Sequence, residues 1–214
     1  MGSALITVYH LSTSRSERIV WLMEELGLEY KLEVFQREAN GAAPPPMKAL
    51  HPLGKAPVIR DGEVVLAESG AIVDYIVHRH AGGRLAVPPE APEFAGYLYW
   101  LHFAEGSLMS LMLIALVLSR VPEAKDSPVK ARITNRMTQM LAFVDGELTG
   151  RSYFVGDAFT AADVMMLFPF TTMRRYLDYD LAPYANVQAY LARIEARPAY
   201  RKAMALAGPD VKRA

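Results

Sequence analysis

A change of pattern along the chain limits its possible folds more than any other feature. Up to residue 82, short apolar and β-branched runs alternate with segments of helical spacing, whereas from residue 93 onward every periodic segment is helical. Glycines and prolines are dense between these parts, as is typical of a boundary between domains. The length of 214 residues allows two small domains. We therefore predict an α/β domain at residues 1–82, a linker at 83–92 and an all-α domain at 93–214.

The N-terminal part has the element order expected of a small mixed sheet. The expected elements are a strand at 5–9, a helix that ends at Gly27, a strand at 30–35, a short helix at 47–50, strands at 57–59 and 64–66, and a helix from Ser69. Asp61-Gly62 lies between the last two strands, and this dipeptide favours a tight hairpin. The predicted order is therefore βαβ followed by αββα.

The C-terminal part shows apolar residues at helical spacing only. Helices are expected at residues 93–119, 128–148, 161–177 and 183–196, with a short helix at the end of the chain. Thr160 and Asp163 have the spacing of a capping box, in which each of two side chains pairs with the backbone of the other residue. We assign this pair to folding and not to chemistry.

Charge and cysteine content exclude several classes of function. The 23 Lys and Arg residues balance the 23 Asp and Glu residues, which argues against a general binder of nucleic acid or of anionic membranes. The absence of cysteine excludes disulfides, thiolate zinc sites and a cysteine nucleophile, and the histidines show no metal-ligand spacing, so we expect no metal. The apolar run at 108–118 is shorter than the roughly 20 residues that span a bilayer, and no signal peptide is visible. We expect a cytoplasmic protein.

A proline stands directly before one of the expected strands, an unusual start because proline donates no ladder hydrogen bond. A cis peptide at Ala56–Pro57 would turn the chain there and leave the N–H and C=O of Val58 free to pair with an extended peptide. Glu68 and Ser69 follow at a strand-to-helix junction, where the Ser69 hydroxyl and N–H suit a carboxylate and Glu68 suits an ammonium. These features predict a site for a small zwitterionic peptide. The alternative is a plain turn followed by an N-capping serine.

Separated motifs in this order resemble those of cytosolic-type glutathione S-transferases. They are His-Pro-Leu-Gly-Lys-Ala-Pro-Val at 51–58, Ala-Glu-Ser-Gly-Ala-Ile-Val-Asp-Tyr-Ile at 67–76, and the segments 9–30 and 153–163. The segment 36–57, with Arg-Glu-Ala-Asn at its start, looks most like a bacterial and fungal subgroup. The resemblance implies an α/β thioredoxin-like domain followed by an all-α domain, a homodimer, and glutathione as co-substrate.

Members of the family activate the thiol of glutathione with a Tyr, Ser or Cys side chain near the end of the first strand. Ser14 matches the position in the serine-type classes, and Ser12, Ser16 and Tyr9 are near enough to compete with it. Ser14 comes just before an expected helix N-terminus, where a hydroxyl and free N–H groups favour a thiolate. The alternative is that Ser14 only caps the helix.

The resemblance also implies the other site residues. Glutathione would contact His51, Lys55, Ala56, Pro57, Val58, Glu68 and Ser69, a hydrophobic electrophile would contact Leu11, Phe103 and Met109, and Glu105 would reach the ammonium of glutathione bound to the partner chain. His51 and Lys55 are cations near the expected glycine carboxylate, although both could be solvated loop residues. The implied activity is conjugation of the glutathione thiolate to electrophiles. Glutathione-dependent reduction of peroxides or disulfides, and non-catalytic binding, are the alternatives.

Overall fold

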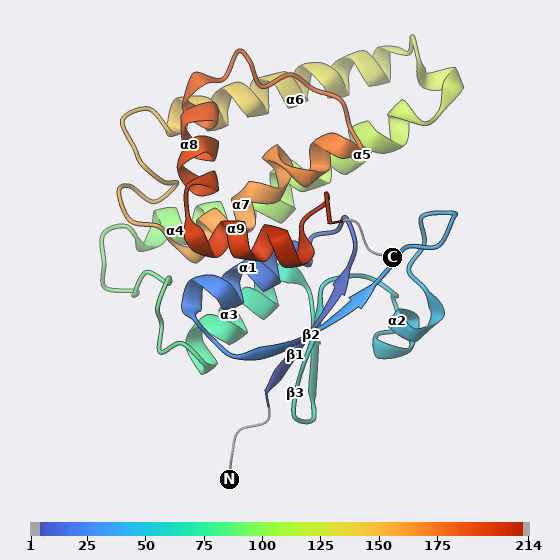
Figure 1. The fold of residues 1–214 in the computed structure, drawn as a ribbon. Helices are drawn as coiled ribbons and strands as arrows, with labels where there is room; N and C mark the ends of the chain where they lie inside the picture. Colours follow the sequence, from blue (N-terminus) through green and yellow to red (C-terminus); the bar gives the residue numbers. More distant parts are fainter. Residues whose placement is uncertain (1–4, 212–214) are drawn as a thin grey trace. The chain divides into compact units, whose positions relative to one another are not determined.

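The computed structural model describes residues 5–211, which form two compact units (Figure 1). The first unit runs up to Arg84 and resumes at Glu195, and the second unit consists of Leu85–Ile194. This division differs at its C-terminal end from the expected all-α domain at 93–214, because residues from Glu195 onward pack with the first unit.

The first unit contains a four-stranded mixed sheet with the strand order β2-β1-β3-β4. Its elements are β1 (Ile6–Leu11), α1 (Glu17–Leu26), β2 (Tyr30–Phe35), α2 (Pro45–Leu50), β3 (Val58–Asp61), β4 (Val64–Ala67) and α3 (Ser69–Arg79). Strand β1 is parallel to β2 and antiparallel to β3, which is antiparallel to β4. The predicted βαβ and αββα order is confirmed, and β1 continues to Leu11, beyond the expected end at residue 9.

Helix α1 buries apolar residues at helical spacing, including Ile19, Val20 and Met23. It ends where Gly27 adopts φ of 61°, a left-handed conformation that glycine reaches without a steric penalty. The C-terminal helix α9 (Pro198–Ala207) packs against α1. This contact explains why the end of the chain belongs to the first unit.

Two kinds of interaction hold α9 on α1. The rings of Trp21 and Tyr200 meet edge to face with centroids 5.1 Å apart. Arg197 donates from Nε and from an Nη to the two carboxylate oxygens of Glu25, both at 2.7 Å. A bidentate pair of this kind is stronger than a single ionic contact because two parallel hydrogen bonds fix its geometry.

The second unit is helical. Its elements are α4 (Phe94–Phe103), the π-helical η1 (Ala104–Met109), α5 (Ser110–Ser119), η2 (Pro122–Ala124), α6 (Pro128–Glu147), α7 (Ala161–Leu167), η3 (Phe168–Phe170), η4 (Thr172–Arg175) and α8 (Ala185–Glu195), which ends one residue beyond the unit. The helix expected at 161–177 is instead a short α-helix followed by two 3₁₀ turns. Pro169 accounts for the break, since proline lacks an N–H and its ring clashes with the preceding turn.

The segments α4, η1 and α5 form one helical stretch, Phe94–Ser119, of 26 residues. By length and composition alone this stretch could cross a membrane. The apolar run at 108–118 in the sequence is only part of it, so that run gives too small a length for the helical segment. Core helices of soluble proteins pass the same test, and residues such as Trp100, Leu108 and Met112 are buried in this unit. The stretch is therefore weak support for a membrane span.

The capping box at the start of α7 forms as predicted. A carboxylate oxygen of Asp163 accepts hydrogen bonds from the Thr160 N–H at 2.8 Å and from its hydroxyl at 3.2 Å, and the other accepts from the Phe154 N–H at 3.1 Å. Burial of the wholly inaccessible Asp163 raises its pKa to about 6, although these hydrogen bonds act in the opposite direction. Asp163 therefore ties the loop before α7 to the helix.

We expect Asp163→Asn to lower the free energy of unfolding by about 1–3 kcal/mol at neutral pH, because the amide NH₂ replaces an accepting oxygen and leaves a backbone N–H unpaired. The difference in the free energy of unfolding between the wild type and this variant should be larger near pH 4 than near pH 7. Since the pKa of Asp163 rises from 3.8 to about 6 on folding, the folded protein holds a proton between these values that the unfolded chain has lost. The contribution of Asp163 to stability thus falls as pH rises through this window.

Urea titrations of both proteins at several pH values measure this difference. Asp157→Asn is the matched control, because Asp157 is exposed and accepts a hydrogen bond from the Ser152 hydroxyl at 3.1 Å. A difference that does not change with pH would contradict the raised pKa of Asp163.

Candidate functional site

A narrow recess in the first unit brings together most of the residues expected to bind a peptide. It has a volume of about 20 Å³ and is lined by Arg15, His51, Leu53, Lys55, Ala56, Pro57, Ala67, Glu68 and Ser69. Of the residues predicted to contact glutathione, only Val58 is not part of this lining. A volume this small does not enclose a tripeptide, so a peptide bound here would lie along the mouth of the recess.

The peptide bond between Ala56 and Pro57 is cis, as predicted. The free backbone edge expected at Val58 is wrong, because Val58 is wholly buried and pairs in register with Tyr9 of β1 and with Ala67 of β4. A residue inside a central strand has its N–H and C=O engaged in the ladder. Ala56 precedes the strand and lines the recess, so the backbone available to a peptide lies there instead.

Glu68 and Ser69 line the recess at the point where β4 meets α3. Glu68 has φ of 71°, a left-handed conformation that is rare and costly for a residue with a Cβ. Glu68 occupies the N-cap position without a side-chain capping bond, and the buried Ser69 is the first residue of the helix. The interpretation of Ser69 as an N-capping serine is therefore wrong. The first N–H groups of α3 and the Ser69 hydroxyl instead suit a carboxylate.

Charge is unevenly distributed around the recess. Arg15, His51 and Lys55 supply cationic or protonatable groups, whereas Glu68 supplies a carboxylate. A peptide with more than one carboxylate and one ammonium would complement this set. Sequence reasoning did not include Arg15. The sequence contained one indication of Arg15, namely that it directly follows the candidate serine Ser14 near the start of a helix.

Ser14 lies in the turn between β1 and α1, immediately before Arg15. Its side chain is buried, its Oγ lies 2.7 Å from Oγ of Ser16, and it accepts a hydrogen bond from the Ser16 N–H at 3.2 Å. The competing hydroxyls are engaged elsewhere: that of Ser12 donates to Gln36, and that of Tyr9 accepts from Arg60 at 3.4 Å. Ser16 is wholly inaccessible. Ser14 is therefore the hydroxyl in this turn that best suits a role at the recess.

Arg37, which follows β2, holds the same turn in place. Its guanidinium donates to the carbonyl oxygens of Ser12 at 3.1 Å, Thr13 at 3.2 Å and Gly41 at 2.8 Å. Thr13 has φ of 52°, so the turn contains a strained residue just before Ser14. A planar cation with several donors stabilises such a conformation because it satisfies carbonyls that the turn leaves without helix or sheet partners.

The residues expected to contact an electrophile belong to both units. Leu11 belongs to a core cluster of the first unit with Ala43 and Met47, and Met109 is buried in the second unit. Contact of these two side chains with an electrophile stays a prediction. Phe103 does line a groove of about 540 Å³ on the second unit, together with Leu98, Tyr99, His102, Gly106 and Ser107.

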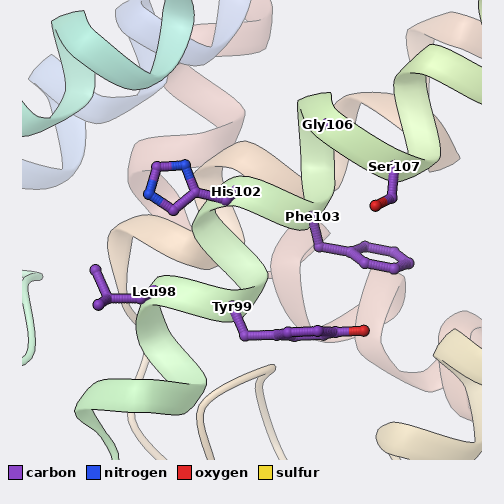
Figure 2. A pocket seen from close by; sticks show the side chains of 6 residues that line it. All are labelled: Leu98, Tyr99, His102, Phe103, Gly106 and Ser107. Carbon is purple, nitrogen blue, oxygen red and sulfur yellow. The ribbon is translucent and has the colours of Figure 1, made fainter.

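Figure 2 shows how this groove is arranged along α4 and η1. Leu98 and His102 point to one side of the helix, whereas Tyr99 and Phe103 stack on the other with ring centroids 5.5 Å apart. Leu98 and Tyr99 are 38% and 49% exposed, so two adjacent large apolar side chains of α4 reach the surface at this groove. Glu105, the residue expected to act across a subunit interface, lies half-buried on η1 in the same region.

Within residues 5–211, no group of three or more His, Asp or Glu side chains is placed to hold a metal ion.

Comparison with known proteins gives matches along most of the chain. The family descriptions "Glutathione S-transferase, N-terminal domain" and "Glutathione S-transferase, C-terminal domain" match residues 4–78 and 108–198. Glutathione S-transferase 3 of Schizosaccharomyces pombe is similar, with 34% identity over 210 residues that cover 92% of this chain and 86% of that protein.

Solved structures are similar over the same length. A glutathione S-transferase from Actinobacillus pleuropneumoniae is 36% identical, with a TM-score of 0.87 over 96% of this chain and 95% of that chain. A sphingomonad glutathione S-transferase solved in complex with glutathione is 25% identical, with a TM-score of 0.76 over 94% of this chain and 98% of that chain.

Proposed function

Because the chain belongs to the glutathione S-transferase family, we propose that its recess binds glutathione and that the protein transfers the glutathione thiolate to hydrophobic electrophiles. The observation that carries this proposal is the juxtaposition of two features. The recess has the charges and backbone groups that a small acidic peptide requires, and the buried Ser14 hydroxyl directly precedes one of its lining residues. Binding and thiol activation are thus assigned to adjoining parts of one unit.

The charges of glutathione match the recess group by group. The Ser69 hydroxyl and the first N–H groups of α3 suit the γ-glutamyl carboxylate, and Glu68 suits the neighbouring ammonium. His51 and Lys55 also line the recess and suit the glycine carboxylate. The backbone of Ala56 replaces that of Val58 as the partner of the central cysteinyl residue, since Ala56 lies in the lining before the strand begins.

Activation of the thiol requires a moderate amount of energy. For a thiol with a pKa of about 8.5, a decrease of about two units raises the thiolate fraction at about pH 7 from about 3% to about 75% and requires about 2.7 kcal/mol. A hydrogen bond to a charged acceptor contributes about 1.5–3 kcal/mol. One well-directed hydroxyl, that of Ser14, is therefore sufficient in magnitude, and the N-terminus of α1 adds to it.

Replacement of both Glu68 and Ser69 by Ala should weaken glutathione binding at least tenfold, or about 1.4 kcal/mol, because it removes the partners of the ammonium and of one carboxylate. Isothermal titration calorimetry measures the dissociation constant. Glu63→Ala serves as a control on the exposed turn between β3 and β4. An unchanged dissociation constant in the double variant would place the peptide elsewhere.

Ser14→Ala should raise the pKa of the bound glutathione thiol by about one to two units, because it removes the hydroxyl that donates to the thiolate. At about pH 7, turnover of a generic aryl halide should fall about threefold to twenty-fivefold, in proportion to the thiolate fraction, while glutathione affinity changes little. Higher pH should restore part of the rate. The ultraviolet absorbance of the thiolate follows its titration directly in the complex.

Ser12→Ala and Tyr9→Phe are the matched controls, since these hydroxyls contact Gln36 and Arg60. A titration that Ser14→Ala leaves unmoved would assign Ser14 to helix structure alone. Glutathione binding without turnover of any electrophile by the wild-type protein would instead favour a non-catalytic binding protein.

We also propose a cytoplasmic homodimer in which the groove on α4 and η1 faces a second copy of the chain. The exposed Leu98 and Tyr99 give this helix an apolar surface that another protein chain would bury. Glu105 lies in the same region and is proposed to reach the ammonium of glutathione bound to the partner.

Light scattering at micromolar concentration should give twice the chain mass of 23.7 kDa. The variant Leu98→Lys/Tyr99→Lys should give the monomer mass, because two charges would be buried without partners. Val129→Lys, at an exposed apolar residue that does not line the groove, should remain a dimer. A monomeric wild-type protein would overturn this arrangement.

A further inference from the structure

Three buried polar side chains form a continuous chain of short contacts behind the recess. Oγ of Ser14 lies 2.7 Å from Oγ of Ser16, and Oγ of Ser16 lies 2.8 Å from Nδ1 of His10. The exposed fractions of Ser14, Ser16 and His10 are 7%, 0% and 1%. Burial makes such contacts matter, because a polar group shielded from water depends on its protein partners.

His10 occupies an unusual position for a polar residue. It shares the face of β1 with Ile6 and Val8, both of which are buried. A buried histidine on an otherwise apolar strand face costs desolvation, which its hydrogen bonds must offset. Its Nδ1 is directed at Ser16 and so toward the turn that carries Ser14.

The Ser16 hydroxyl is not used to cap α1. Ser16 stands at the N-cap position, but its side chain makes no capping hydrogen bond. Its Oγ instead accepts from the Leu11 N–H at 3.1 Å and lies 3.3 Å from the Leu11 carbonyl oxygen. The Ser16 hydroxyl therefore contacts the end of β1 and the side chains of His10 and Ser14. Helix capping does not explain its position.

Hydrogen-bond counting allows two polarities of this chain. If Nδ1 of His10 carries no hydrogen, Ser16 donates to His10 and Ser14 donates to Ser16, so the Ser14 hydrogen points inward. If Nδ1 carries a hydrogen, His10 donates to Ser16 and Ser16 donates to Ser14. The Ser14 oxygen then accepts from the Ser16 hydroxyl and N–H, and its own hydrogen is left to point outward.

We propose that His10 is a positioning residue that, through Ser16, directs the hydrogen of the Ser14 hydroxyl toward the thiolate. The proposal rests on the proposed function, in which Ser14 donates to the thiolate of bound glutathione. His10 does not touch glutathione; it supplies the Nδ1 hydrogen that fixes the direction of the chain. No proton is gained or lost along the chain in this role.

Substitutions at His10 and Ser16 separate positioning from packing. His10→Leu removes the donor, whereas His10→Asn places an amide nitrogen near the position of Nδ1 and retains a donor. Ser16→Ala interrupts the series of hydrogen bonds between His10 and Ser14. Ser14→Ala removes the hydroxyl that this series is proposed to direct. The charged residues near the start of α1, namely Arg15 in the turn before it and Glu17 and Arg18 in its first turn, are the same in every variant and contribute equally to each titration.

Each variant is saturated with glutathione, and the bound thiol is titrated by the ultraviolet absorbance of its thiolate. We expect His10→Leu and Ser16→Ala to raise the apparent pKa of the thiol by about half to one unit, and His10→Asn to titrate within about 0.2 units of the wild type. At about pH 6.5, kcat/KM for an aryl halide should fall about twofold to sixfold in the first two variants, in proportion to the thiolate fraction. The glutathione dissociation constant should stay within about twofold of the wild-type value.

A double variant tests whether Ser16 acts through Ser14. Removal of Ser16 in the Ser14→Ala background should leave the thiol pKa where Ser14→Ala alone puts it, because the hydroxyl to be directed is already absent. Additive shifts would overturn the proposal. Near-ultraviolet circular dichroism and glutathione affinity verify that each variant is folded, and His10→Leu and Ser16→Ala each suffice if the other fails to fold.

The outcomes distinguish this inference from the function on which it rests. If Ser14→Ala shifts the titration but His10→Leu and Ser16→Ala do not, His10 has no positioning role and Ser14 keeps its own. If Ser14→Ala leaves the titration unmoved, thiol activation by Ser14 fails and the positioning role fails with it. A shift in His10→Asn equal to that in His10→Leu would assign the effect to packing and overturn the proposal.

Discussion

The attachment of the β1–α1 turn to the end of β1 is the constraint on which the site depends. The Ser16 hydroxyl accepts from the Leu11 N–H, so the chain reverses between the last residue of the strand and the first turn of the helix. Arg37 fixes the outer side of this turn through two of its carbonyl oxygens, those of Ser12 and the strained Thr13, and ties it to the loop after β2 through the carbonyl oxygen of Gly41. With both sides held, Ser14 is buried beside Ser16, while the next residue lines the recess.

The sheet order joins this turn to the rest of the recess. Strand β1 lies between β2 and β3, and its antiparallel pairing with β3 matches Tyr9 to Val58. The carboxyl end of β1 and the amino end of β3 therefore lie at the same edge of the sheet. The βαβ segment supplies the serine turn there, and the ββα segment supplies the cis proline before β3 and the Glu68–Ser69 junction after β4. Neither segment alone contains the whole set.

Local signals in the sequence predicted the parts of this arrangement that local chemistry controls. Proline before a strand indicated the cis bond at Ala56–Pro57, and the spacing of Thr160 and Asp163 indicated the capping box. Pairing across the sheet is not local, so the sequence did not show that Val58 has partners on both sides. Burial is not local either, so the sequence did not show that Leu11 and Met109 are among the buried residues of the fold. The sequence also did not indicate that Arg15 lines the recess, because the direction of its side chain depends on the conformation of the turn that contains Thr13.

The position of His10 gives a reason why hydroxyl direction matters as much as hydroxyl presence. If the hydroxyl hydrogen points toward the recess and away from it equally often, turning it toward a thiolate costs only about 0.4 kcal/mol. If the hydrogen prefers the inward direction tenfold, turning it toward the thiolate costs about 1.4 kcal/mol. That second value is about half of the roughly 2.7 kcal/mol needed to lower a thiol pKa by about two units. A bare Nδ1 of His10 would create this inward preference, since it is the acceptor at the end of the Ser14–Ser16 chain. A hydrogen on Nδ1 removes it, so one buried tautomer decides how much of the Ser14 hydrogen bond reaches the recess.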